Sequence, residues 1–125
     1  MVLSGVEVMV PDRAGFRRWL EANHESEPAA WVVLTKKGGT VTALTYEEAV
    51  LEALCFGWID GQGRSRDAET TFIRFTPRSK KSKWSMSNVN RVAQLQREGL
   101  MTDAGRAAVA AAKADGRWDA ALAGS

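Results

Sequence analysis

The segment WIDGQGRSRDAETTFIRFT, residues 58–76, constrains the fold more than any other part of the chain. Two strand-like arms, about 58–65 and 70–76, flank the turn-forming residues 66–69, and this arrangement predicts a β-hairpin. Alternate residues of a strand point to opposite faces of a sheet, so one face of the second arm holds Thr71, Ile73 and Phe75. We expect this hairpin to form part of a small antiparallel sheet.

Two more segments are typical of strands. Residues 29–37, AAWVVLTKK, are rich in β-branched and aromatic side chains and precede two glycines, so we expect a central strand there. A shorter strand is expected around residues 6–8, and it ends before Pro11.

Four helices are expected from cap residues and apolar spacing. The capping box formed by Thr45 and Glu48 begins one helix, which runs to Gly57. The other three begin at Asp12, at Ser85 or Ser87 (ending near Gly99) and at Thr102 (ending near Gly116). The inner faces of the first three helices along the chain hold Phe16, Trp19, Leu20, Val50, Leu51, Leu54, Val89, Val92 and Leu95. The sequence therefore predicts a single α+β domain, residues 1–125, in which about four helices pack on a small antiparallel sheet.

Composition and motifs exclude several classes of protein. The apolar content of 45% and the charged content of 26% are ordinary for a globular domain. Cys55 is the only cysteine, which excludes an internal disulfide, and no structural zinc site is predicted because other soft ligands are few. The chain has no P-loop, GxGxxG, HExxH, CxxC or EF-hand pattern, so we expect neither a metal nor a cofactor.

The first residues, MVLSGVEVMVP, lack the basic start of a signal peptide. No run of residues approaches the roughly 18 apolar side chains that a membrane span needs. We therefore expect a cytoplasmic protein without membrane insertion.

Charge is distributed unevenly along the chain. Residues 70–97 hold seven basic residues and no acidic residue, although the formal net charge of the whole chain is only +2. Such a segment can attract phosphates, nucleic acid or anionic metabolites. Three of its basic residues, Lys80, Lys81 and Lys83, are more simply interpreted as solvated surface side chains.

The best candidate site lies where this basic segment enters the third helix. The free N–H groups of a helix that begins at Ser85 can bind an anion. Arg74 and Arg78 can each hold a carboxylate or a phosphate through two parallel hydrogen bonds, and a structural role suits them equally well. Trp84 can stack on a ring of a ligand, or it can belong to the core.

Four further residues complete the predicted pocket. Lys36 and Asp60 are expected to line it, Trp58 is expected to form a second aromatic wall, and Asn88 lies one turn into the third helix. The ligand predicted from these side chains is a small anionic or aromatic molecule.

Asp60 is also a weak candidate for a catalytic acid or base. It lies between Trp58 and two nearby glycines, where a carboxyl group can have a perturbed pKa. The simpler interpretation is a buried ion pair with Arg74 or Lys36 that holds the hairpin to the sheet. No second carboxylate, histidine or metal-ligand spacing accompanies Asp60.

Cys55 and His24 are the remaining reactive side chains. Cys55 falls in the last turn of a predicted helix between two apolar residues, which indicates a buried and inert thiol. His24 is the only histidine and lies near the end of the first helix, where a cation suits the helix dipole. A Cys–His dyad is the less favoured interpretation because the two residues belong to different elements.

Several stretches together resemble the bacteriocin-protection (YdeI/OmpD-associated) family of small bacterial proteins. These stretches are TYEEAV (45–50), ALCFGWIDG (53–61), RFTPR (74–78), Ser82 with Trp84-Ser85 and Asn88, GLMTDAG (99–105) and AAKADGRWDAA (111–121). The resemblance covers nearly the whole chain, and its motifs occur in the family's order. It implies a bacterial, cytosolic α+β domain linked to envelope stress or toxin resistance, and it implies no particular reaction.

Three functions are therefore open at the level of the sequence. The favoured one is a binding module for a small anionic or aromatic ligand. The alternatives are nucleic-acid binding through residues 70–97, which would weaken steeply with salt, and an enzyme that uses Asp60. The sequence names neither the ligand nor the oligomeric state.

Overall fold

The computed structural model describes residues 4–124 and shows an α+β fold, as predicted. Four strands form one sheet in the order β1-β2-β4-β3, and they are β1 (Val6–Val8), β2 (Ala30–Thr35), β3 (Trp58–Ser65) and β4 (Thr70–Pro77). The predicted hairpin is confirmed as the antiparallel pair β3 and β4, and β2 is central as expected. The sheet is mixed because β1 pairs with β2 in parallel.

The connection between β1 and β2 explains the parallel edge. The helix α1 (Arg13–Asn23) lies between β1 and β2 in the chain. It carries the chain back to the end of the sheet at which β1 began, so β2 starts from that end. A crossover of this kind makes two strands run in the same direction, whereas a tight turn would have made them antiparallel. The predicted antiparallel sheet is therefore present in β2, β4 and β3, and the edge pair β1–β2 is parallel.

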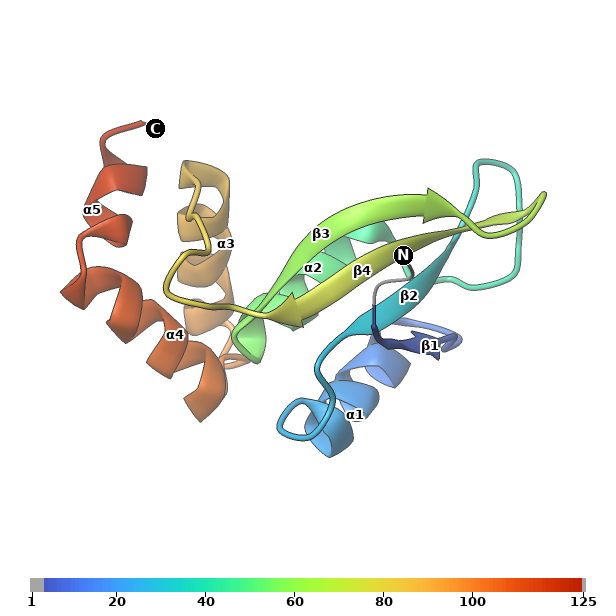
Figure 1. Cartoon of the computed structure of the whole chain (residues 1–125), viewed down its shortest axis with the longest axis horizontal. Coiled ribbons are helices and arrows are strands. Elements are labelled where there is room, and N and C mark those ends of the chain that lie inside the picture. The colour runs from blue at the N-terminus through green and yellow to red at the C-terminus, as the bar shows by residue number, and fades with distance from the viewer. Residues whose placement is uncertain (1–3, 125) are drawn as a thin grey trace.

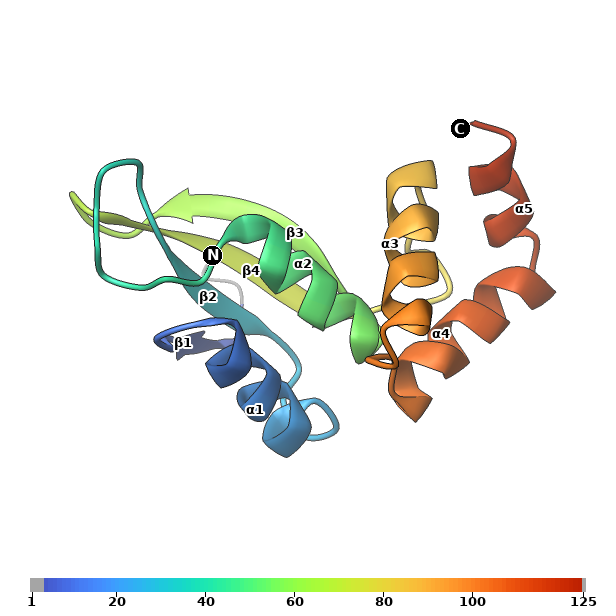
Figure 2. The same ribbon diagram turned by 180° about the vertical axis from the view of Figure 1, so that it is seen from behind.

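The helices occupy two regions of the molecule. Figures 1 and 2 show α1 and α2 (Tyr46–Cys55) on one face of the sheet. The last three helices, α3 (Met86–Arg97), α4 (Asp103–Ala114) and α5 (Arg117–Leu122), form a group beyond the end of β4. One hydrophobic core contains residues of both regions, including Phe16, Leu20, Trp58, Phe75 and Leu95.

All four predicted helix caps are confirmed. Asp12, Ser85 and Thr102 each accept a hydrogen bond from a backbone N–H three residues later, and Thr45 forms the full capping box with Glu48. The short helix α5 was not predicted. Gly116 ends the preceding helix with a φ of 88°, and the six residues that follow are too few to show helical periodicity.

A close contact between α2 and α4 fixes the second group of helices against the first. The backbone N–H of Thr102 donates to the carbonyl oxygen of Cys55 at 3.1 Å, and the Thr102 hydroxyl donates to the same oxygen. A Cβ on Gly105 would lie 2.3 Å from that oxygen, so only glycine fits. This contact sets the position of α4 beside the loop that leaves β4.

Among residues 4–124, no helix combines the length and the apolar content that a membrane crossing requires.

Candidate functional site

The predicted site centres on the loop between β4 and α3. The backbone N–H of Arg78 donates to the carbonyl oxygen of Gly57 at 2.9 Å, which anchors the start of the loop to the end of α2. The Ser79 N–H donates to the Ser82 hydroxyl at 2.9 Å and turns the chain back toward α3. Ser85 then caps α3, so the loop delivers Trp84 directly to the start of that helix.

Arg78 and Trp84 form a stacked pair at the base of this loop. The guanidinium carbon of Arg78 lies 3.8 Å from the centroid of the Trp84 ring. Arg78 Nη1 donates to the backbone carbonyl of Lys83 at 3.0 Å. The Trp84 side chain is buried, with 6% exposure, and its ring centroid lies 5.3 Å from that of Trp118.

Arg117 ties the loop to the corner between α4 and α5. Its Nη1 donates to the carbonyl oxygens of Ser79 at 2.9 Å and Ser82 at 2.8 Å, while its Nε donates to Asp115. The site prediction missed Arg117. The only sequence signal for it was its place in the AAKADGRWDAA stretch, since a tether to residues 35 or more positions away leaves no local pattern.

Two hollows flank Trp84 and Arg117, which line both. The larger has a volume of about 520 Å³, and its other lining residues are Lys81, Ser82, Lys83, Ser85, Asn88 and Ala120. The smaller has a volume of about 260 Å³, and its other lining residues are Arg78, Ser79, Lys80, Ala108 and Ala111. Among residues 4–124 no carboxylate lines either hollow, and each is lined by three cationic side chains.

Burial and charge both act on Arg78. Burial, which Asp60 opposes and the nearby Arg117 cation reinforces, lowers the pKa of its guanidinium to about 10. Burial withdraws the Arg78 guanidinium from water, which otherwise stabilises its positive charge. Arg117 places a second positive charge nearby, and that charge is paired with Asp115.

The structure divides the predicted site residues into two groups. Trp84, Ser85 and Asn88 line the larger hollow, and Arg78 lines the smaller one together with Trp84. The three loop lysines are exposed, as predicted. The remaining predicted residues lie elsewhere.

Trp58, Arg74 and Lys36 do not reach these hollows. Trp58 is 1% exposed and packs in the core against Trp19, so its predicted role as a pocket wall was wrong. Arg74 Nε donates to the backbone carbonyl of Ser4 at 3.0 Å, beside the N-terminal strand.

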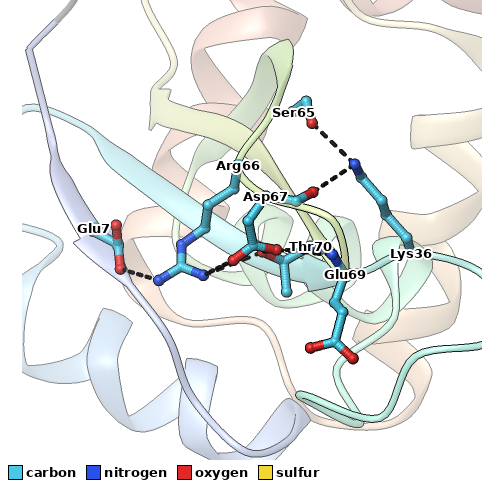
Figure 3. A network of polar contacts seen from close by, with 7 residues as sticks. All are labelled: Glu7, Lys36, Ser65, Arg66, Asp67, Glu69 and Thr70. Carbon is cyan, nitrogen blue, oxygen red and sulfur yellow. Dashed lines mark hydrogen bonds and ion pairs between the residues drawn. The ribbon is translucent and has the colours of Figure 1, made fainter.

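Lys36 belongs to a polar network at the tip of the hairpin (Figure 3). Its Nζ donates to the Ser65 hydroxyl at 2.9 Å and to the Asp67 carbonyl at 2.7 Å. In the same network, Arg66 bridges Asp67 and Glu7. Because these bonds link the hairpin turn to β1 and β2, the network is structural.

Asp60 pairs with a different residue from the ones predicted. In the described part of the chain it forms no ion pair with Arg74 or Lys36, and its Oδ2 accepts a hydrogen bond from the Tyr46 hydroxyl. Burial, followed by the bond to Asp60, raises the pKa of Tyr46 to about 12. Tyr46 begins α2 and Asp60 is the third residue of β3, so this bond joins the helix to the strand.

Arg91 makes a second link between α2 and α3. It holds Glu47 through two hydrogen bonds of 2.9 Å and donates to Asn88 Oδ1 at 2.8 Å. The Asn88 carbonyl is therefore engaged within the protein, and its position at the rim of the larger hollow is fixed.

Cys55 is buried, as predicted. Burial, with the nearby Glu52 carboxylate, raises the pKa of its thiol to about 11 although Arg17 opposes this. His24 packs against Phe56, and its Nδ1 contacts the Leu20 carbonyl at 2.7 Å. Within residues 4–124 no hydrogen bond joins the histidine to the cysteine.

A buried carboxylate on α2 also escaped prediction. Glu52 is 2% exposed and accepts hydrogen bonds from Arg13 Nε at 2.6 Å and Arg17 Nη1 at 2.9 Å. The available signal was one acidic residue within the apolar run AVLEALC, the part of α2 that is buried at every position. This ion-pair group holds α1 against α2.

These features define an α+β domain with two cation-lined hollows at the junction of its sheet and its C-terminal helices. Residues 8–108 match the family described as a domain of unknown function (DUF8412), and the chain belongs to this family. The matched range includes Arg78, Trp84, Ser85 and Asn88. No curated protein matches the chain, and no solved structure matches it.

Proposed function

We propose that the domain is a binding module for a small organic anion, which occupies the larger hollow beside Trp84. The observation that carries this proposal is the lining of the hollow, in which Lys81, Lys83 and Arg117 surround a volume of about 520 Å³ and no carboxylate of residues 4–124 takes part. A volume of this size suits a small molecule rather than a polymer. The start of α3 at Ser85 adds backbone N–H groups and a partial positive charge.

The hollow also favours a ligand with a flat apolar part. Trp84 contributes an aromatic wall, and Ala120 contributes a small apolar side chain. Hydroxyl and amide groups at Ser82, Ser85 and Asn88 can orient such a ligand. The supported class is therefore an aromatic or short aliphatic acid.

Benzoate and its neutral analogue benzamide test the proposal by calorimetric titration. We expect benzoate to bind and benzamide to bind at least about tenfold more weakly, because only benzoate carries the charge that the lysines recognise. The double variant Lys81→Gln/Lys83→Gln should weaken benzoate binding by roughly threefold to tenfold.

The matched control is Arg18→Gln/Lys37→Gln, which removes the same charge from exposed side chains outside both hollows. It should bind benzoate like the wild type. Equal binding of benzoate and benzamide, or equal losses in the two double variants, would overturn the proposal.

Nucleic-acid binding through residues 70–97 is a second candidate, and the exposed loop lysines favour it. Two observations reduce its support, because Arg91 is paired with Glu47 and Arg78 is stacked on Trp84. A single-stranded oligonucleotide whose affinity falls steeply with salt, and falls further in the Lys81→Gln/Lys83→Gln variant, would favour this function over the first.

We also propose a cytoplasmic location and retain the resemblance to the bacteriocin-protection family as a hypothesis. The lone cysteine supports the location, since it cannot form an internal disulfide. Fractionation of cells that produce the protein, with a periplasmic and a cytoplasmic marker, tests the location. Survival of a deletion strain exposed to bacteriocins tests the hypothesis on resistance.

A further inference from the structure

Two side chains that line the smaller hollow, Arg78 and Trp84, each carry a buried hydrogen-bond donor that has no acceptor among residues 4–124. Trp84 Nε1 and Arg78 Nε are both shielded from solvent, and neither donates a hydrogen bond to any residue in the described range 4–124. Trp84 is only 6% exposed, so its N–H group cannot turn to bulk water as a surface side chain would. A buried donor without an acceptor is costly, and such groups are rare in folded proteins.

The stacking of the two side chains does not satisfy these donors. The N–H bonds of a guanidinium and of an indole lie in the planes of the groups, whereas the contact between Arg78 and Trp84 joins the face of the ring to the guanidinium at 3.8 Å. The contact therefore leaves these N–H bonds available at the edges of the two groups. One acceptor that reached both edges would satisfy both donors.

The charges around the smaller hollow specify what kind of acceptor fits. Arg78, Lys80 and Arg117 line it, and no carboxylate from the described part of the chain does. Asp115 compensates Arg117, but no carboxylate in the described range forms an ion pair with Arg78. A negatively charged oxygen would supply an acceptor for the two donors and a counter-charge for the arginine at the same time.

The shape of the hollow limits the size of the group. Its volume is about 260 Å³, and the two alanines of α4 that line it, Ala108 and Ala111, leave room beside the stacked pair. Ser79 and Lys80 line the same hollow and are exposed, so this part of the loop opens to solvent. The space suits a small oxyanion or the oxyanion end of a larger ligand.

We infer that the smaller hollow is an oxyanion-binding subsite in which Arg78 Nε and Trp84 Nε1 donate to one carboxylate or phosphate group. This subsite is separate from the larger hollow and does not require a ligand there. It assigns Arg78 a direct binding role and gives Trp84 a second role besides that of an aromatic wall.

Inorganic phosphate and acetate, titrated separately at constant ionic strength, are the probes. The indole N–H signal of Trp84 and the Nε–H signal of Arg78 are followed by NMR, and Trp84→Phe identifies the first of these signals. We expect both signals to move on addition of the oxyanion and to remain in place with chloride. The ion that moves them at the lower concentration identifies whether the subsite prefers a phosphate or a carboxylate.

Two variants test the subsite, one by removing a donor and the other by filling the hollow. Trp84→Phe removes the indole donor but keeps an aromatic ring for the arginine, and it should weaken oxyanion binding by about tenfold or more. Ala111→Leu fills the hollow from an exposed helical position and should weaken binding at least as much. The matched controls are Trp118→Phe and Ala110→Leu, which should bind the oxyanion within about twofold of the wild type.

The same set of variants separates this inference from the proposed function. Ala111 lines only the smaller hollow, whereas Lys81 and Lys83 line only the larger one. If Ala111→Leu leaves phosphate and acetate binding unchanged, or if the Trp84 signal does not move, the subsite does not exist whatever benzoate does. If Ala111→Leu abolishes oxyanion binding while the lysine variant has no effect on benzoate, the subsite stands and the proposed function falls.

Discussion

Replacing Glu52 by Gln tests how much the buried ion-pair group contributes to stability. The substitution keeps the shape of the side chain and removes its negative charge, leaving Arg13 and Arg17 without a counter-charge. The two bonds of 2.6 and 2.9 Å are charge-assisted, and breaking a fully buried pair typically costs about 3–5 kcal/mol.

The solvent exposure of the two arginines reduces this expected loss of stability. Their side chains are 31% and 26% exposed, so water can partly solvate them once the carboxylate is gone. We therefore expect Glu52→Gln to lower the free energy of unfolding by about 2–3 kcal/mol.

Glu47→Gln is the matched control on the same helix. Glu47 also binds one arginine, Arg91, through two hydrogen bonds, but its side chain is 54% exposed. Exposed pairs contribute about 0–1 kcal/mol, so a loss of at most roughly 1 kcal/mol is expected.

Urea unfolding of both variants, followed by tryptophan fluorescence and circular dichroism, measures the difference. A loss for Glu52→Gln no larger than that for Glu47→Gln would show that burial does not strengthen this pair, and the reasoning would be refuted. Equal slopes of the unfolding curves are required for the comparison, because a changed slope signals a changed unfolded or native state.

Three further predictions concern α2 and its neighbours. Gly105→Ala should destabilise the protein by roughly 1–3 kcal/mol in urea unfolding, since its Cβ would lie 2.3 Å from the Cys55 carbonyl oxygen; a stabilised variant would mean that the helices separate freely. Tyr46 is the only tyrosine, so ultraviolet titration of the protein should give a midpoint near its pKa of about 12. Asp60→Asn should lower this midpoint, and an unchanged midpoint in the variant would contradict the bond. The contribution of the Tyr46–Asp60 bond to stability is complete below about pH 10 and is lost as the pH rises toward 12. Cys55 should not react with a thiol reagent at pH 8 in the folded protein and should react fully in urea, so rapid reaction of the native protein would show that the thiol is accessible.

The parts of the fold that depend on neighbouring residues were predictable from the sequence. A helix cap needs a suitable side chain and an N–H group three residues later, and the cap residues Asp12, Thr45, Ser85 and Thr102 all provide this. The hairpin was predictable for the same reason, because its turn and both arms lie within one segment. The parallel edge strand was not, since its direction depends on where α1 packs.

The candidate site was predictable only in part. Trp84, Ser85 and Asn88 are close in the chain, and they meet at the larger hollow. Arg74 and Arg78 were expected to act together, but residues four positions apart along an extended strand are separated by roughly 13 Å.

Arg117 illustrates the remaining limit. It reaches the carbonyl oxygens of Ser79 and Ser82 from another helix, and such bonds to backbone atoms place no requirement on the type of the partner residue. No pairing rule between side chains can therefore reveal them.

The contact between Thr102, Gly105 and the end of α2 has a consequence for genetics. This contact holds α4 in place, and α4 forms one wall of the smaller hollow through Ala108 and Ala111. A random mutagenesis screen for loss of binding should therefore recover substitutions at Gly105 together with those in the hollows. Such alleles would be separable by temperature, because a packing defect worsens on heating whereas a missing binding group is absent at every temperature.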